Sequence, residues 1–194
     1  MPPSSLPGLR QQILAAARRL FIEKGYHGLS MRQIAEAVGV SKAALYYHFE
    51  DKEELFLAVL EAHVVEAEAI IDEAQIEGRT ARDRIRLIVQ AIFDQPAEQR
   101  AIIRLASQEM ALLEDPARLA FRRVYQDRFI DRIQGILETG IRNGELRALD
   151  PRLATWCLLG MMYPYFYPAY QIEMPPVSEV IEQLLEIYLD GIAK

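Results

Sequence analysis

Cysteine is nearly absent from this sequence, and so are the marks of secretion. Cys157 is the only cysteine among the 194 residues, which excludes an intramolecular disulfide and fits the reducing cytoplasm. The stretch before Ile13 lacks the apolar core of a secretory signal. We therefore expect a cytoplasmic protein, in which Cys157 serves as a small buried apolar residue.

Motifs of the common enzyme classes are missing as well. The sequence contains no HExxH, CxxC, GxSxG, P-loop or GxGxxG pattern. His27, His48 and His63 are scattered, and none lies at a recognisable metal-binding spacing. We expect no enzymatic activity, no metal and no cofactor, and we interpret His63 as a surface residue or a satisfied core residue.

Basic residues are fewer than acidic ones, which at first argues against nucleic-acid binding. The net charge of −6 is unevenly spread, however: residues 1–49 hold six Lys and Arg against two acids, and the remainder holds 16 against 26. A basic N-terminal part on an acidic body concentrates attraction for phosphate at one end. The distribution supports a nucleic-acid contact near the N-terminus, although solvated surfaces alone can also produce it.

A pair of short helices joined by a tight turn is predicted near the N-terminus. Ser30 followed three residues later by Gln33 is the capping-box pattern that begins a helix. Gly39 suits the left-handed conformation that ends it. Ser41 can then cap a second helix, whose apolar face includes Leu45. Two helices in this arrangement are typical of the helix-turn-helix.

The second helix carries side chains that suit a DNA contact on the faces that its apolar residues do not use. The N-terminal residues of such a helix meet base edges in the major groove, and here these are Lys42, Ala43 and Ala44. Further along lie three side chains able to donate to phosphate: Tyr46, Tyr47 and His48. The alternative is an ordinary helical hairpin in a core, with its tyrosines packed inward.

A third helix is predicted to begin at Asp51, because Glu54 follows it at the capping-box spacing. Lys52 then lies in the first turn, where the helix dipole disfavours a cation. A DNA phosphate nearby would account for its presence. The helix is predicted to continue to Gln75, far enough to transmit motion from the body of the protein to the helix pair.

Residues 13–60 resemble the N-terminal signature of the TetR family of bacterial transcriptional regulators. The resemblance is carried by Gly25-Tyr26, by Ser30 and by the run IAEAVGVSKAALYYHFEDKEELF that begins at Ile34. It implies a regulator, expected to be a repressor, that binds a palindromic double-stranded DNA operator as a homodimer. Residues expected at or near the DNA are Ser30, Arg32, Ser41, Lys42, Ala43, Ala44, Tyr46, Tyr47, His48 and Lys52.

The remainder of the chain is predicted to be helical too, since no run shows the strict apolar–polar alternation of a strand. Pro, Gly and capping residues mark where helices begin and end. They predict helices at Ala81 to Asp94, Ala97 to Leu113, Pro116 to Arg142, Pro151 to Tyr163 and Ser178 to Ile192. The expected fold is all-α. Residues 1–51 would form a three-helix DNA-binding domain, and residues 52–194 a helical ligand-binding and dimerisation domain.

Leu153 to Tyr170 is a run of eighteen residues without a formal charge. Its two prolines and many aromatic residues make it a poor membrane span, so no membrane partner is expected. It can be a helix packed between subunits or a wall of a ligand cavity. The ligand-binding residues predicted on the second interpretation are Trp156, Met161, Met162, Tyr163, Phe166 and Tyr167.

The resemblance also implies that the last two long helices form a four-helix dimer interface beside the ligand. Residues predicted at that interface are Gly160, Val180, Ile181, Leu184, Leu185 and Tyr188. The expected effector is a hydrophobic or aromatic small molecule that releases the operator. The segment GIRNGELRALDPRLATWCLLGMM is similar to TetR-like regulators of lipid metabolism and of other hydrophobic compounds, which leaves acyl derivatives, sterol-like molecules and planar drugs open. The alternative function is a ligand-independent DNA-binding protein whose body serves only for dimerisation.

Overall fold

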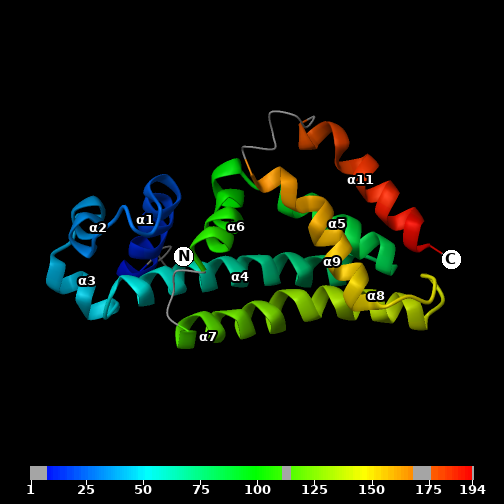
Figure 1. The fold of residues 1–194 in the computed structure, drawn as a ribbon, viewed down its shortest axis with the longest axis horizontal. Coiled ribbons are helices and arrows are strands. Elements are labelled where there is room, and N and C mark those ends of the chain that lie inside the picture. Colours follow the sequence, from blue (N-terminus) through cyan, green and yellow to red (C-terminus); the bar gives the residue numbers. More distant parts are fainter. Residues whose placement is uncertain (1–7, 111–114, 168–175, 194) are drawn as a thin grey trace, which may run out of the picture.

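The computed structural model confirms the predicted all-α fold (Figure 1). It describes residues 8–110, 115–167 and 176–193, and no β-strand occurs in these ranges, although an isolated bridge pairs Leu146 with Ala193. The elements are α1 (Leu9–Lys24), α2 (Met31–Val38), α3 (Lys42–His48), α4 (Lys52–Glu77), α5 (Ala81–Asp94), α6 (Ala97–Glu109), α7 (Asp115–Tyr125), a π-helical segment (Gln126–Ile130), α8 (Asp131–Arg142), α9 (Pro151–Met162), a 3₁₀ turn (Tyr163–Phe166) and α11 (Val177–Ile192).

The helix pair near the N-terminus begins and ends as its capping residues predict. Ser30 and Gln33 make both halves of a capping box, and Gly39 ends α2 with φ of 79° in the left-handed region. Ser41 Oγ accepts a hydrogen bond of 3.1 Å from the Ala44 amide and so caps α3. Leu45 is fully buried, which fixes the side of α3 that faces the core.

The cap of α4 differs in one half from the predicted capping box. Asp51 Oδ1 accepts from the Glu54 amide at 2.8 Å, as expected. The Glu54 carboxylate, however, accepts from the amide of Glu50 rather than from that of Asp51. The helix still begins at the predicted residue, because one satisfied amide and the two acidic residues of its first turn suffice to stabilise this end.

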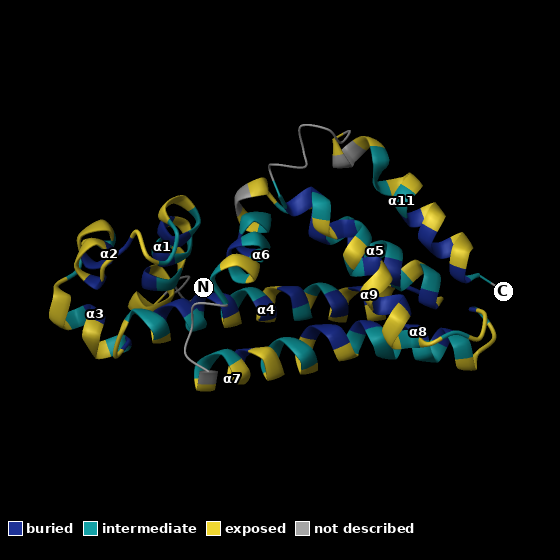
Figure 2. Ribbon diagram, in the orientation of Figure 1, coloured by how far each residue is buried: buried dark blue, intermediate teal, exposed yellow. Residues whose placement is uncertain are grey.

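Helix α4 contributes to two hydrophobic clusters. Its first part, including Leu55, Phe56 and Leu60, packs with α1–α3 and with α6 and α7. Its later part, including Ile71, packs with α5, α8, α9 and α11. Figure 2 shows buried residues along the whole length of this helix. A single rigid element therefore connects the N-terminal helices with the body.

The body closes over α4 through contacts between α5, α9 and α11. Arg82 Nη2 donates to Asp190 Oδ1 at 2.6 Å, and Arg86 pairs with Glu182. The hydroxyl of Tyr188 donates to the carbonyl of Ala154 at 3.0 Å, which joins α11 to α9. These contacts hold α11 against its own protomer.

The helix predicted from Pro116 to Arg142 is interrupted. It begins one residue earlier, and its middle, Gln126–Ile130, is π-helical before α8 continues to Arg142. The extra residue of a π turn shifts the side chains on either side of it, and such segments occur frequently at functional sites. Tyr125 and Phe129 flank and occupy this segment, and both face the cavity described below.

The uncharged stretch that begins at Leu153 divides into α9 and the 3₁₀ turn, and its last three residues lie outside the described ranges. None of the described helices combines the length and hydropathy that a membrane span requires. The helix predicted to end at Leu113 ends at Glu109, and residues 111–114 are also outside those ranges. Cys157 is exposed on α9, so the expectation that it is buried is wrong.

Candidate DNA-binding and effector-binding sites

The exposed face of α3 presents a basic and aromatic surface. Tyr47 is 86% exposed, and Tyr46 is exposed beside it. The ammonium group of Lys42 lies 5.4 Å from the centre of the Tyr46 ring. Because Leu45 and Phe49 are buried on the opposite side, the tyrosines point away from the core. The alternative of an inward-packed helical hairpin does not hold for this helix.

The residues predicted to contact DNA lie around this same surface. Most of them are exposed, namely Ser30, Arg32, Ser41, Lys42, Ala43, Tyr46 and Tyr47. Three are half-buried: Ala44, His48 and Lys52. Arg32 lies 3.7 Å from Glu36 within α2, an exposed pair that leaves the guanidinium accessible. Their contact with DNA remains a prediction.

Lys52 has an intramolecular role that the sequence did not suggest. Its Nζ donates to the carbonyls of Tyr26 and Leu29 at 2.9 and 3.0 Å. It also lies 4.2 Å from the centre of the Tyr26 ring. These contacts tie the first turn of α4 to the connection between α1 and α2, and they account for a cation at that end of the helix without a phosphate.

We expect Lys52→Met to lower the free energy of unfolding by about 1.5–3 kcal/mol, because two charge-assisted hydrogen bonds to backbone carbonyls are lost. Lys42→Met is the matched control. Lys42 is also the first residue of a helix, α3, but its ammonium contacts only the exposed ring of Tyr46. Urea unfolding of both variants checks the prediction. Equal stability of the two would show that the carbonyl contacts of Lys52 do not stabilise the fold.

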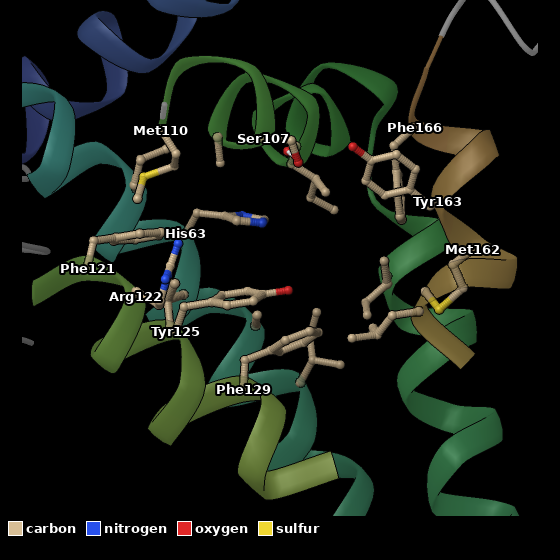
Figure 3. A pocket seen from close by; sticks show the side chains of 18 of the residues that line it. His63, Ser107, Met110, Phe121, Arg122, Tyr125, Phe129, Met162, Tyr163 and Phe166 are labelled. Carbon is tan, nitrogen blue, oxygen red and sulfur yellow. Dashed lines mark hydrogen bonds between the residues drawn. The ribbon is translucent and has the colours of Figure 1, made fainter. Parts of the chain in front are cut away.

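A cavity of about 520 Å³ lies between α4, α6, α7 and α9 (Figure 3). This volume is within the usual range for small-molecule sites. Of the six residues predicted to bind a ligand, four line it: Trp156, Met162, Tyr163 and Phe166. Met161 and Tyr167 instead pack against the body cluster outside the lining. Gly160, predicted at the dimer interface, also lines the cavity.

The cavity is largely apolar, but its lining also holds Arg122, His63 and the neutral polar side chains Gln95, Ser107, Tyr125 and Tyr163. Arg122 and His63 define what we call its polar end. Figure 3 shows His63, Arg122 and Tyr125 together near Phe121 and Met110, while Met162, Tyr163 and Phe166 lie at the opposite end. Burial raises the pKa of Tyr125 to about 12, so its hydroxyl keeps its proton at neutral pH. No aspartate or glutamate is among the lining residues. The sequence did not indicate that His63, Arg122 and Tyr125 would line a cavity, since none of them lies in the uncharged stretch.

His63 also differs from its sequence interpretation, because one of its ring nitrogens is buried without a hydrogen bond. This nitrogen, Nδ1, has no partner in the part of the chain that the structure describes. Glu66 Oε2 lies 3.7 Å from it, beyond hydrogen-bond distance. The position at i, i+3 on α4 places Glu66 directly behind the histidine, away from the cavity lining.

Glu66 connects this end of the cavity with the N-terminal helices. Arg18 Nη1 on α1 donates to both carboxylate oxygens at 2.9 and 2.8 Å, and Arg18 Nη2 donates to the carbonyl of Gln99 on α6 at 3.2 Å. His63, and beside it Arg18, hold the pKa of Glu66 below its ordinary value against the effect of burial. Arg18 thus binds α1, α4 and α6 together.

A second contact joins α1 with α6. The amide of Tyr26, just after the end of α1, donates to Glu109 Oε1 at 3.3 Å. The two helices therefore touch at both ends of α6, through Gln99 near its start and Glu109 at its last residue. Any displacement of α6 by a molecule in the cavity would act on α1 at both points.

The predicted interface residues divide into two groups. Val180, Ile181 and Leu184 are half-buried, and Gly160 is exposed. Leu185 and Tyr188, by contrast, are 2% and 5% exposed within the protomer, where they pack in the body cluster. The structure thus gives these two a role in the protomer core. The exposed apolar side chains of α9 and α11 are Leu153, Trp156 and Ile187.

Comparison with known proteins identifies two family regions in this chain. Residues 13–59 match the family described as bacterial regulatory proteins, tetR family, and residues 78–164 match the tetracyclin repressor-like C-terminal domain. The transcriptional repressor KstR2 of Rhodococcus jostii is 25% identical over 98% of this chain and 94% of its own. The transcriptional activator FasR of Mycolicibacterium smegmatis is 44% identical, but over only 44% of this chain and 39% of its own length.

Solved structures share the fold over nearly the full chain. FadR of Bacillus subtilis, in complex with stearoyl-CoA, superposes with a TM-score of 0.81 and 24% identity, covering 94% of this chain and 98% of that one. The helix-turn-helix surface of α2 and α3, the helical C-terminal part and the two matched family regions lead to one conclusion. The chain belongs to the TetR family of bacterial transcriptional regulators.

Proposed function

We propose that this regulator is a dimeric repressor whose operator affinity falls when a hydrophobic small molecule fills the cavity beside α4. The observation that carries the proposal is the position of that cavity. Its lining includes Leu60, His63 and Val64 of α4, the helix that also packs against α1–α3. A ligand that displaces this part of α4 would change the orientation of the DNA-contacting helices. In this proposal residues 1–51 bind DNA and residues 52–194 bind the effector and the partner subunit.

An acyl derivative is the effector class that we propose. The lining is largely apolar and includes the adaptable side chains Met110 and Met162. The similar structure FadR of Bacillus subtilis binds stearoyl-CoA. A flexible acyl chain can adapt to a largely apolar cavity of about 520 Å³. The runner-up, a ligand-independent dimer, would need no cavity in its body.

A two-fold dimer is part of the same proposal, because one α3 covers only a few base pairs. The two DNA-binding domains of a dimer should contact half-sites of a near-palindrome about 34–36 Å apart, or a multiple of that distance. A ligand can weaken operator binding only if it favours a conformation in which the two domains no longer match this spacing. The arrangement of α4 supports such a mechanism, since its first turns pack with the DNA-binding helices and its later turns with the body.

The test begins with selection of an operator from a pool of random duplex DNA, followed by titration with palmitoyl-CoA. We expect the ligand to lower operator affinity by about 5–150-fold, the range of ordinary allosteric coupling. Operator must lower the affinity for palmitoyl-CoA by the same factor, since the coupling is reciprocal. Coenzyme A without an acyl chain is the control and should have no effect. Equal affinity for palmitoyl-CoA with and without operator would contradict the proposal.

A further inference from the structure

We propose that the effector carries an anionic head, and that Arg122, Tyr125 and His63 recognise it at the polar end of the cavity. This inference rests on the proposed function, because it concerns the molecule that fills the same cavity. It adds the chemical class of the head group and the residues that select it. The shared chemistry is an apolar chain that ends in an anion, either a carboxylate or a phosphate of a carrier such as coenzyme A.

The lining of the cavity carries a permanent positive charge. Arg122 is the one residue of the lining that carries a full positive charge at any working pH, and no carboxylate faces it there. No hydrogen-bond or ion-pair partner of its guanidinium is found among the described residues. Arg122 is both exposed and part of the lining, which places it at the mouth of the cavity. A cationic or neutral head would leave this charge uncompensated once the mouth is closed by ligand.

The cavity also contains a hydrogen-bond donor from the same helix as Arg122. The Tyr125 hydroxyl points toward the middle of the cavity, and no partner for it is found within the described residues (Figure 3). Because its pKa is raised by burial, it is a proton donor and not a second anion at neutral pH. A donor that is removed from water without an acceptor costs free energy, and an anionic oxygen would recover that cost.

His63 lies between the cavity and Glu66. A neutral imidazole has a single N–H group, so an anion on the cavity side and the Glu66 carboxylate behind the ring would compete for it. Since Glu66 also holds Arg18, the head group would be sensed at the contact between α4 and the N-terminal helices.

The remaining lining suits the apolar chain better than the anionic head group. Its side chains are apolar, as in Ile70, Ile92 and Phe129, or neutral, as in Gln95 and Ser107. An anion placed against them would lose its hydration without a cation to compensate for it. We therefore expect the head group to lie toward Arg122 and the chain toward α9.

The experiment compares palmitate, hexadecanol and palmitoyl-CoA by calorimetric titration of the full-length protein. We expect wild-type protein to bind palmitate more tightly than hexadecanol by on the order of tenfold or more, the effect of charge-assisted hydrogen bonds. Arg122→Gln and Tyr125→Phe should each remove most of that advantage while leaving hexadecanol affinity unchanged. Arg123→Gln is the matched control, since Arg123 is the adjacent exposed arginine and is not part of the lining.

The three ligands show whether the anion is a carboxylate or a phosphate. They also separate failure of this inference from failure of the proposed function. If the anion is a phosphate, palmitoyl-CoA alone loses affinity in Arg122→Gln, and palmitate and hexadecanol bind alike. Equal binding of palmitate and hexadecanol, together with no effect of either variant on palmitoyl-CoA, overturns the inference but leaves the proposed function intact. No binding of any of the three overturns both. Unchanged helical circular dichroism of each variant shows that an observed loss does not come from unfolding.

Discussion

Release of operator by ligand is expected to fail in the Arg18→Met variant, although the variant still binds both molecules. Arg18 holds the Glu66 carboxylate of α4 and the Gln99 carbonyl of α6, and it belongs to α1. A ligand that moves α4 or α6 can turn the N-terminal helices only if they are held to those elements. Removing the guanidinium while keeping an apolar side chain of similar length should abolish most of a coupling free energy of about 1–3 kcal/mol.

The ratio of operator affinities with and without palmitoyl-CoA measures this effect. Arg19→Met is the control, because Arg19 follows on the same helix, is exposed and has no ion-pair partner in the described ranges. Its substitution can weaken DNA binding, but the ratio should stay that of the wild-type protein. Glu66→Gln should reproduce the effect of Arg18→Met, and the double variant should add little, since both remove one interaction. A wild-type ratio in Arg18→Met would exclude this contact as the coupling route.

Local sequence signals predicted the ends of the helices well. Ser30, Ser41 and Thr80 cap helices through their own side chains, and each is recognisable because its bond reaches only two or three residues along the chain. Asp150 before Pro151 caps α9 in the same way, by accepting from the amides of Arg152 and Leu153. Such contacts need no knowledge of the tertiary structure, and this explains why they could be predicted.

The polar end of the cavity could not be predicted from the sequence, because its members come from two helices far apart in the chain. Periodicity shows which face of α4 is apolar, but it does not show that His63 and Tyr125 line the same cavity. The role of Arg18 could not be predicted for the same reason, because its partners Glu66 and Gln99 lie on two other helices. The uncharged stretch from Leu153 predicted one wall of the cavity, but nothing in the sequence indicated the opposite wall formed by α4 and α7.

The π-helical segment had no signal in the sequence at all. Gln126–Ile130 contains neither proline nor glycine, and its residues fit a regular helix. Its position between α7 and α8 depends on tertiary packing, where Phe129 and Ile130 are buried against the body cluster. The helices predicted to form the dimer illustrate the same limit, because the sequence does not show which apolar residues of α11 pack within the protomer. Which residues serve which contact follows only from burial.

Two exposed apolar residues provide a test of the proposed dimer that spares the core. Leu153 on α9 is 64% exposed and Ile187 on α11 is 67% exposed, and neither lines the cavity. Leu184 and Leu185 are less suitable, because Leu185 is buried and a charge there would lower the stability of the protomer by several kcal/mol. The chosen variant is therefore Leu153→Glu together with Ile187→Glu.

We expect this double variant to be a folded monomer that binds the full operator more weakly by on the order of 10²–10⁴-fold, the contribution of joining two binding modules. Binding to a single half-site should be unchanged, because α2 and α3 are untouched. Leu119→Glu on α7 is the control, as Leu119 is an exposed apolar residue outside α9 and α11. Sedimentation measures the oligomeric state, and thermal unfolding verifies that the fold persists. Four like charges would face one another across a two-fold interface formed by these helices, so a double variant that sediments as a dimer would place the interface on another surface.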